Sequence, residues 1–172
     1  DIEYDPTSTE FRLDKYLRVT YDAYDDDKNP IRVPLTYGVD YEFVTPPTNN
    51  IGEDNIAYIK PIDGSKFWVG TGEVKYKVTA GLDGVEFPEI PANREYVYQH
   101  GMPVLTVEGL KVVLNGKTLK YPDDYKAELI KGDAINVGDH TIRLTGSGKE
   151  YTGTYDLHFK IVPYNLQDAV KE

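Results

Sequence analysis

Polar and apolar residues alternate along several short segments of the chain, and this pattern predicts β-strands with one buried face. The clearest segment runs from Tyr155 to Ile161, where every odd position is apolar or aromatic and every even position is polar. The same alternation occurs over residues 74–78, 141–145 and 55–60. A helical period of 3.6 residues is nearly absent. The chain is therefore expected to be all-β.

Turn-forming residues separate the predicted strands. Asn115-Gly116, flanked by apolar residues, is typical of a two-residue hairpin turn, and Pro46-Pro47 does not suit a central strand. Short strands spaced by about ten residues are typical of a β-sandwich. The core of this sandwich is expected to include the apolar positions of the two clearest strands, which are Leu157, Phe159, Ile161, Val74, Tyr76 and Val78.

An internal repeat divides the chain into two similar halves. Three landmarks recur in the same order at nearly constant offsets: residues 37–41 at 121–125, residues 50–52 at 136–138, and residues 68–71 at 151–154. The glycine that ends the second landmark is expected to adopt a positive φ in a tight turn. We predict two modules, 1–81 and 82–172, joined around residues 80–84.

The second module carries an ordered set of short motifs, which are Asn115-Gly116-Lys117-Thr118-Leu119, Asn136-Val137-Gly138, Tyr151-Thr152-Gly153-Thr154 and Phe159-Lys160-Ile161-Val162-Pro163. This set resembles the tandem immunoglobulin-like repeats of large surface and secreted proteins of Gram-positive gut bacteria, over nearly all of residues 90–166. The resemblance implies two immunoglobulin-like β-sandwich modules in a longer multidomain chain, with no catalytic motif. The first module departs from the pattern, because Trp68 replaces the repeat's Tyr and residues 21–29 form a longer acidic segment.

Composition excludes several functions. The chain has 172 residues and a formal charge of -10, from 19 Lys and Arg against 29 Asp and Glu. This acidic balance argues against binding to nucleic acid or to anionic lipid. No apolar segment approaches the roughly 20 residues of a membrane helix, so no membrane insertion is expected. The chain starts at Asp1 without Met, which indicates a mature or excised piece. The absence of Cys excludes disulfides and thiol nucleophiles.

Catalytic motifs are not evident. The three histidines, His100, His140 and His158, lack the spacing of metal ligands and are expected to be solvated. Residues 146–150 superficially resemble a phosphate-binding loop, but Glu150 stands where a Walker A motif needs Ser or Thr. No Ser lies in a nucleophile elbow. We expect no enzymatic activity and no cofactor, and no residues are singled out for a Lys-Asn isopeptide bond.

Adjacent aromatic residues are the candidate ligand site. Phe67 and Trp68 lie side by side in a Gly-bounded loop, and Tyr151 is the counterpart of Trp68 in the second module. Successive side chains of an extended segment point to opposite sides, so one ring of a pair can face solvent and stack on a sugar. The alternative is that these rings close the end of the sandwich.

An acidic segment is a candidate Ca²⁺ site. Asp25, Asp26, Asp27 and Asn29 offer carboxylate and amide oxygens. The EF-hand template fails, because Pro30 stands where Gly is needed and Thr36 where Glu is needed. The alternative is a solvated acidic hairpin.

These observations favour a non-catalytic spacer or adhesion module located outside the cell or on its surface. The alternative is a carbohydrate-binding module that uses the aromatic residues around Trp68. A third hypothesis, binding of a host or cell-surface protein through a sheet edge, cannot be separated from the first by sequence. The expected partners are flanking domains of a longer chain and a glycan or surface protein, without nucleic acid.

Overall fold

The computed structural model describes residues 2–5, 10–65 and 68–169, and it is all-β as predicted. Strands account for 44% of the structure. Helix is limited to the short α1 (Leu166–Ala169) and the 3-10 turns η1 (Leu13–Lys15) and η2 (Leu82–Gly84). Within the described ranges, no helix is long and apolar enough to cross a membrane. The chain forms two compact units, Asp1–Thr79 and Ala80–Glu172.

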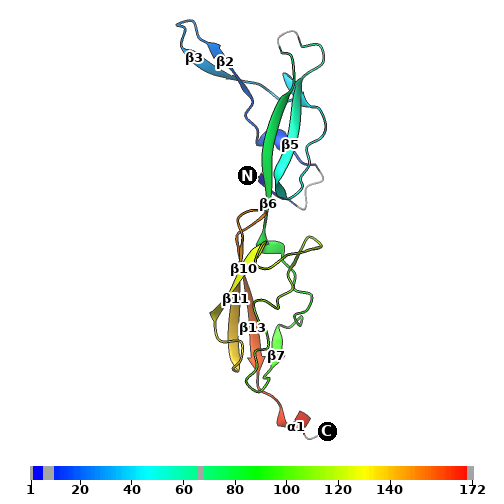
Figure 1. Cartoon of the computed structure of the whole chain (residues 1–172), viewed down its shortest axis with the longest axis vertical. Helices are drawn as coiled ribbons and strands as arrows, with labels where there is room; N and C mark the ends of the chain where they lie inside the picture. The colour runs from blue at the N-terminus through cyan, green and yellow to red at the C-terminus, as the bar shows by residue number, and fades with distance from the viewer. Residues whose placement is uncertain (1, 6–9, 66–67, 170–172) are drawn as a thin grey trace. The chain divides into compact units, whose positions relative to one another are not determined.

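The first unit contains a four-stranded sheet and a separate hairpin (Figure 1). The sheet consists of β1 (Ile2–Glu3), β4 (Tyr41–Phe43), β5 (Gly52–Pro61) and β6 (Gly72–Gly81), in the order β1-β6-β5-β4. β4, β5 and β6 pair antiparallel, whereas β1 pairs parallel with β6. The hairpin consists of β2 (Thr20–Tyr24) and β3 (Pro30–Pro34).

The second unit has the same arrangement of strands. Its sheet consists of β7 (Glu95–Val97), β10 (Tyr125–Lys131), β11 (Gly138–Gly146) and β13 (Thr154–Val162), in the order β7-β13-β11-β10. β10, β11 and β13 pair antiparallel, and β7 pairs parallel with β13. A short hairpin joins β8 (Val113–Leu114) to β9 (Lys117–Thr118), and β12 (Tyr151–Thr152) pairs with Ala80 and Gly81 at the end of β6.

The strand register also repeats between the units. Ala57 pairs with Val74 in the first unit, and Ile142 pairs with Leu157 at the corresponding position of the second. Gly52 and Gly138 both have a positive φ, of 152° and 146°, as the repeated turn predicts. The sequence repeat therefore corresponds to a repeated pattern of strand pairing.

A turn before the antiparallel strands is built in the same way in both units. The N–H of Thr36 donates to the carboxylate of Asp40 over 2.7 Å in the first unit. The N–H of Lys120 donates to the carboxylate of Asp124 over 2.7 Å in the second. In each unit the tyrosine within this turn, Tyr37 or Tyr121, packs against the tyrosine that begins the following strand, with ring centroids 5.8 Å apart.

The core lies on one face of each sheet, where the alternation of residues predicts it. In the second unit Leu157, Phe159 and Ile161 are buried, and in the first unit Tyr76 and Val78 are buried. Val74 packs at the margin of the first core. Further buried side chains complete the two cores, among them Ile2, Leu13 and Ala57 in the first unit and Leu114, Tyr125, Ile142 and Leu144 in the second.

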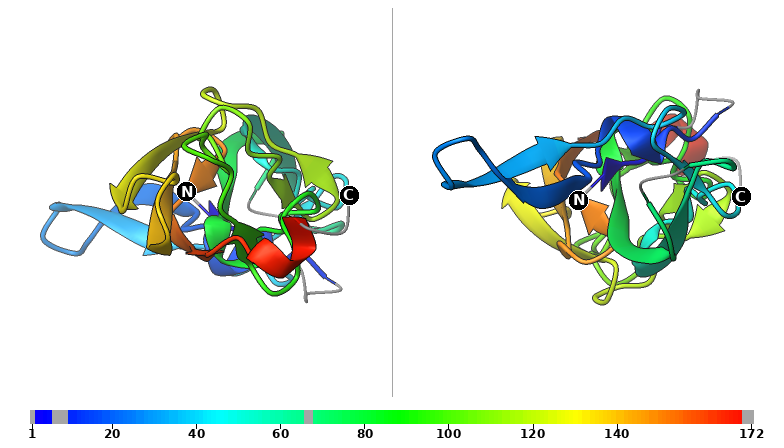
Figure 2. Two further views of the ribbon diagram at one scale, coloured as in Figure 1. Left: turned by 90° about the horizontal axis from the view of Figure 1, so that it is seen from below. Right: turned by 90° about the horizontal axis from the view of Figure 1, so that it is seen from above.

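The hairpins are where the units differ most. The β8–β9 hairpin has two residues in each strand and turns at Asn115-Gly116, both of which have a positive φ as the hairpin turn requires. The β2–β3 hairpin has five residues in each strand and a longer acidic loop. It extends away from the sheet of its own unit, as Figures 1 and 2 show.

Truncation of Phe159 to Ala should lower the free energy of unfolding of the second unit by about 3–5 kcal/mol. The ring is buried and packs against Tyr96 and His140, with ring centroids 5.9 Å and 5.2 Å away, so its removal leaves a cavity. Urea unfolding followed by NMR signals of the second unit measures the loss. The exposed neighbour His158, changed to Ala, is the control, and a loss below about 1 kcal/mol in Phe159→Ala would contradict the burial.

Candidate functional site

Trp68 packs at the base of the β2–β3 hairpin rather than standing alone in solvent. It lies in the loop between β5 and β6, and its ring centroid is 4.6 Å from that of Tyr21 on β2, with the rings tilted by 58°. The backbone N–H of Trp68 donates to the hydroxyl of Ser65 over 3.3 Å. The half-buried indole thus holds the hairpin against the loop that precedes β6.

A hollow of about 220 Å³ opens beside the Trp68 ring. Its walls are largely apolar. They come from the loop before β6, from the segments that flank the β2–β3 hairpin and from the ends of β4 and β5. The apolar lining residues include Val19, Leu35, Tyr41, Ile59, Pro61 and Val69. Asp40 and Thr71 add polar groups at the wall. Its apolar lining with few polar groups is typical of small-ligand sites, but its volume is below the roughly 300–1,000 Å³ of most such sites.

Phe67, the second aromatic residue of the predicted pair, lies outside the described residues. The aromatic contact that the structure describes for Trp68 is with Tyr21. Sequence reasoning missed Tyr21, because it lies 47 positions before Trp68 and no local pattern relates the two.

Tyr151 is buried, so it has no face to offer a glycan. Only 1% of its surface is exposed. Its strand β12 pairs with the end of β6, and the ammonium group of Lys117 lies 5.4 Å from its ring centroid. Burial of the ring agrees with the structural alternative considered for this residue.

The acidic loop of the hairpin is held by one of its own carboxylates. Asp25 accepts hydrogen bonds from the backbone N–H groups of Asp27 and Asn29, over 3.0 Å and 2.8 Å, and from the Asn29 side-chain amide over 3.2 Å. The bonds from Asn29 contribute most to lowering the pKa of Asp25 below its ordinary value. Asp26 and Asp27 are exposed in the same loop. Among the described residues, no three His, Asp or Glu side chains are grouped so as to hold a metal ion.

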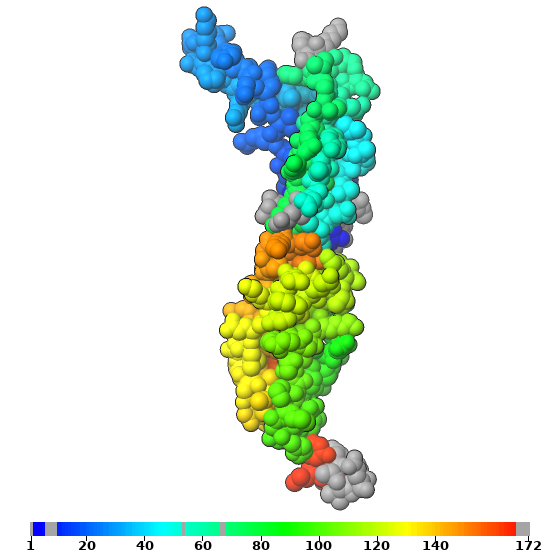
Figure 3. All heavy atoms as spheres, viewed as in Figure 1, coloured from blue at the N-terminus to red at the C-terminus, as the bar shows by residue number. Residues whose placement is uncertain are grey.

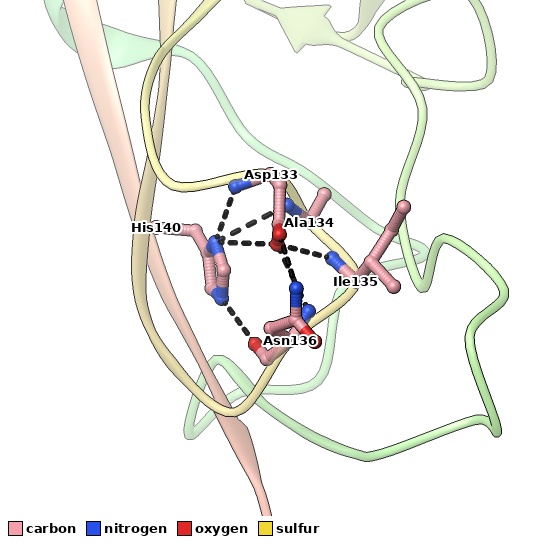
Figure 4. A network of polar contacts seen from close by, with 5 residues as sticks. All are labelled: Asp133, Ala134, Ile135, Asn136 and His140. Carbon is pink, nitrogen blue, oxygen red and sulfur yellow. Dashed lines mark hydrogen bonds and ion pairs between the residues drawn. The ribbon is translucent and has the colours of Figure 1, made fainter.

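His140 is buried, so the prediction of a solvated histidine was wrong at this position. Only 4% of its surface is exposed, and it stacks on Phe159. Its Nδ1 accepts the N–H groups of Asp133 and Ala134, each over 3.2 Å, so the proton is on Nε2, which donates to the carbonyl of Asn136 over 2.8 Å (Figure 4). His100 and His158 are exposed as predicted.

Asn55 holds the corresponding loop of the first unit. It is buried, and its side-chain amide donates to the carbonyls of Asn50 and Gly52 over 2.8 Å and 3.1 Å. Asn55 pairs with Tyr76 in the sheet just as His140 pairs with Phe159. These two side chains occupy equivalent positions in the repeat, and both serve structural roles.

Protein-family models, curated proteins and solved structures offer no match to this chain.

Asp133 should make the second unit less stable in acid. Its carboxylate accepts backbone N–H bonds from Asn136 and Ile135, each over 2.9 Å, and these bonds lower its pKa from the ordinary 3.8 to about 2. Because the pKa is lower in the folded state, ionised Asp133 stabilises the fold above pH 4, and this contribution is lost as the pH falls from about 4 to about 2.

Urea unfolding at several pH values between 2 and 5 measures this effect. Asp133→Asn should flatten the pH dependence in that window, whereas Asp123→Asn, at an exposed position of the same unit, should not. Some dependence will remain in Asp133→Asn, because Arg143 lowers the pKa of Asp156. An unchanged pH profile in Asp133→Asn would contradict the role of this carboxylate.

Proposed function

We propose that the chain is a non-catalytic extracellular spacer and adhesion module of a larger bacterial surface or secreted protein. Its two units are immunoglobulin-like sandwiches, in which the four-stranded sheet forms one layer and segments outside the sheet, such as residues 11–17 of the first unit, cover the other side of the core. The main support for the spacer function is how the terminal strands of each unit pair. In each unit the first strand is hydrogen-bonded in parallel to the last strand.

This parallel pairing determines how a unit responds to tension. When the ends are pulled, the first and last strands are drawn in opposite directions along their own axes. All hydrogen bonds between them are then loaded together. Neighbouring strands pulled apart from one end would instead lose their bonds one after another. A unit with parallel terminal strands is therefore suited to transmit force, as a spacer between domains must.

Side chains and extra backbone bonds support the pairing in the second unit. Lys160 N–H donates to the carbonyl of Arg94 over 2.9 Å, and Tyr98 N–H donates to that of Val162 over 3.0 Å. The Arg94 guanidinium donates to the Tyr155 hydroxyl over 3.0 Å. In the first unit Tyr4 N–H donates to the carbonyl of Thr79 over 2.6 Å.

Single-molecule pulling of the whole chain tests the spacer function. We expect two unfolding events, with length gains of about 25 nm and about 30 nm for the two units at roughly 3.6 Å per residue, less the folded length. The event of the second unit should require the higher force, because three residues of β7 pair with β13, whereas two residues of β1 pair with β6.

Pulling direction provides the control, because the chain has no Cys and engineered pairs define the attachment points. Attachment at Asn93→Cys and Tyr164→Cys loads the β7–β13 bonds together. Attachment at Lys126→Cys and Thr145→Cys, which are cross-strand partners on β10 and β11, opens that pair from one end. The first geometry should require clearly more force. Equal unfolding forces in the two geometries would contradict the proposal that the β7–β13 hydrogen bonds resist tension.

The second candidate function is carbohydrate binding in the first unit, which the apolar hollow beside Trp68 favours. Affinity electrophoresis on soluble starch, xylan, β-glucan and mucin glycans tests it. A spacer should migrate without retardation on every glycan. Retardation that Trp68→Ala abolishes would favour the second function. Tyr24→Ala is the matched control, because Tyr24 is an exposed aromatic residue of the β2–β3 hairpin and does not line the hollow.

A further inference from the structure

We propose that the free edge of β2 binds an extended segment of another protein by β-strand addition. The inference deepens the proposed role in adhesion by naming the surface and the chemistry of the partner. It rests on the adhesion part of that proposal alone, since the spacer function is tested separately by force. A strand can be added only where backbone groups of the hairpin point outward.

The hydrogen-bond pattern of the hairpin identifies the outward groups. The N–H of Leu35 donates to the carbonyl of Val19 over 2.8 Å, and the N–H of Asp25 donates to the carbonyl of Asn29 over 3.0 Å. Because hydrogen-bonded pairs alternate with non-bonded pairs in antiparallel strands, Thr20, Asp22 and Tyr24 occupy non-bonded positions. Their N–H and C=O groups point away from β3.

The two edges of the hairpin differ in what they offer a partner. The cross-strand neighbours of Thr20, Asp22 and Tyr24 are Pro34, Arg32 and Pro30. Prolines lack an N–H, so the outer edge of β3 presents a single donor and is closed to an added strand. The outer edge of β2 presents three donors and three acceptors. Among the described strands, none pairs with this edge.

The side chains of the hairpin suit a third strand. Tyr21, Ala23, Ile31 and Val33 form one apolar face, because successive side chains of a strand point to opposite sides. A two-stranded ribbon buries such a face poorly and is marginally stable in water. Tyr21 and Ile31 remain more than a third exposed. Figures 1 and 3 show the hairpin standing clear of the sheet of its unit.

The repeat shows that this length is not needed to build a unit. The second unit completes the same arrangement of strands with a hairpin of two residues per strand. The additional residues of β2 and β3 are therefore available for a role that the second unit lacks.

Charge selects the partner and its direction. Asp22 lies at the centre of the edge, and its ion pair with Arg32 is long, at 3.5 Å, between highly exposed side chains, which makes the pair weak. Asp25, Asp26 and Asp27 follow at the loop end. At the other end, Arg18 borders a hollow with Thr20, Arg32 and Pro34. An antiparallel partner strand therefore needs basic residues at its beginning and centre and an acidic residue at its end.

A second copy of this chain does not meet these requirements. Antiparallel pairing of two β2 strands about their centre would place Asp22 opposite Asp22, and like charges directly opposite each other destabilise a sheet. Each chain also carries a net charge of -10. The occupant that fits is an extended segment of a different protein, with Lys or Arg opposite Asp22.

A designed strand peptide serves as the probe. Acetyl-Lys-Thr-Val-Lys-Val-Thr-Val-Glu-amide, aligned antiparallel to β2, places Lys opposite Asp22 and Glu opposite Arg18. Its binding to the full chain is followed by NMR, by the fluorescence of Trp68, which is the only Trp, and by calorimetry. We expect shifts and added exchange protection at the amides of Thr20, Asp22 and Tyr24. No shift at these amides would overturn the proposal.

Two proline variants test the edge itself. Asp22→Pro removes the central outward donor without removing a bond between β2 and β3, and it should weaken binding about tenfold or more. Arg32→Pro makes the matched change on the edge that is already closed and should leave binding within about twofold. Cross-strand NMR contacts between Tyr21 and Val33 verify that each variant keeps the hairpin. Equal losses in both variants would overturn the assignment of the edge.

Charge reversal and peptide controls complete the test. Asp22→Lys keeps the N–H, and it should weaken binding of the probe and favour a peptide with Glu at the central position. A probe whose β2-facing amides are N-methylated should bind at least tenfold more weakly, since it cannot donate to the edge. Self-association of the chain that Asp22→Pro abolishes would identify a second copy as the occupant and overturn the proposal.

Discussion

The last strand of each unit is the element on which the rest of the structure depends. β6 lies between β1 and β5, and β13 lies between β7 and β11, so both edges of each last strand are hydrogen-bonded. Alternate side chains of the same strands, such as Val78 and Ile161, are buried in the cores. The first strand has only two or three paired residues, and all of them pair with the last strand. Without that edge the first strand of either unit would lose its described strand pairing.

The local parts of this fold could be predicted from the sequence. The alternation from Tyr155 to Ile161 marks a strand and its buried face, and Asn115-Gly116 marks a hairpin whose φ values require those residue types. The repeat indicated that one pattern of pairing would serve both halves. Each of these signals arises from residues that are neighbours in the chain.

The remaining features depend on contacts between distant residues. The pairing of Ile2 with Val78 involves too few residues to produce an alternating pattern, and nothing near Trp68 indicates that Tyr21 will be its neighbour. His140 is a different case. It is on the same side of β11 as the buried Ile142 and Leu144, so the alternation of residues already predicted its burial. The prediction failed because His is a polar residue type.

Equivalent positions of the two units carry different buried polar residues, Asn55 and His140. This difference disfavours the exchange of strands between the units. Adjacent repeats with similar sequences are prone to misassembly, because a strand of one can enter the sheet of the other while both are incomplete. Here the equivalent strands carry different polar groups into the interior. The His140 ring accepts two N–H groups and donates to one carbonyl. The Asn55 amide donates to two carbonyls and accepts the hydroxyl of Thr48. A strand in the wrong unit would leave buried N–H or C=O groups without partners, which is an energetic cost against exchanged strands.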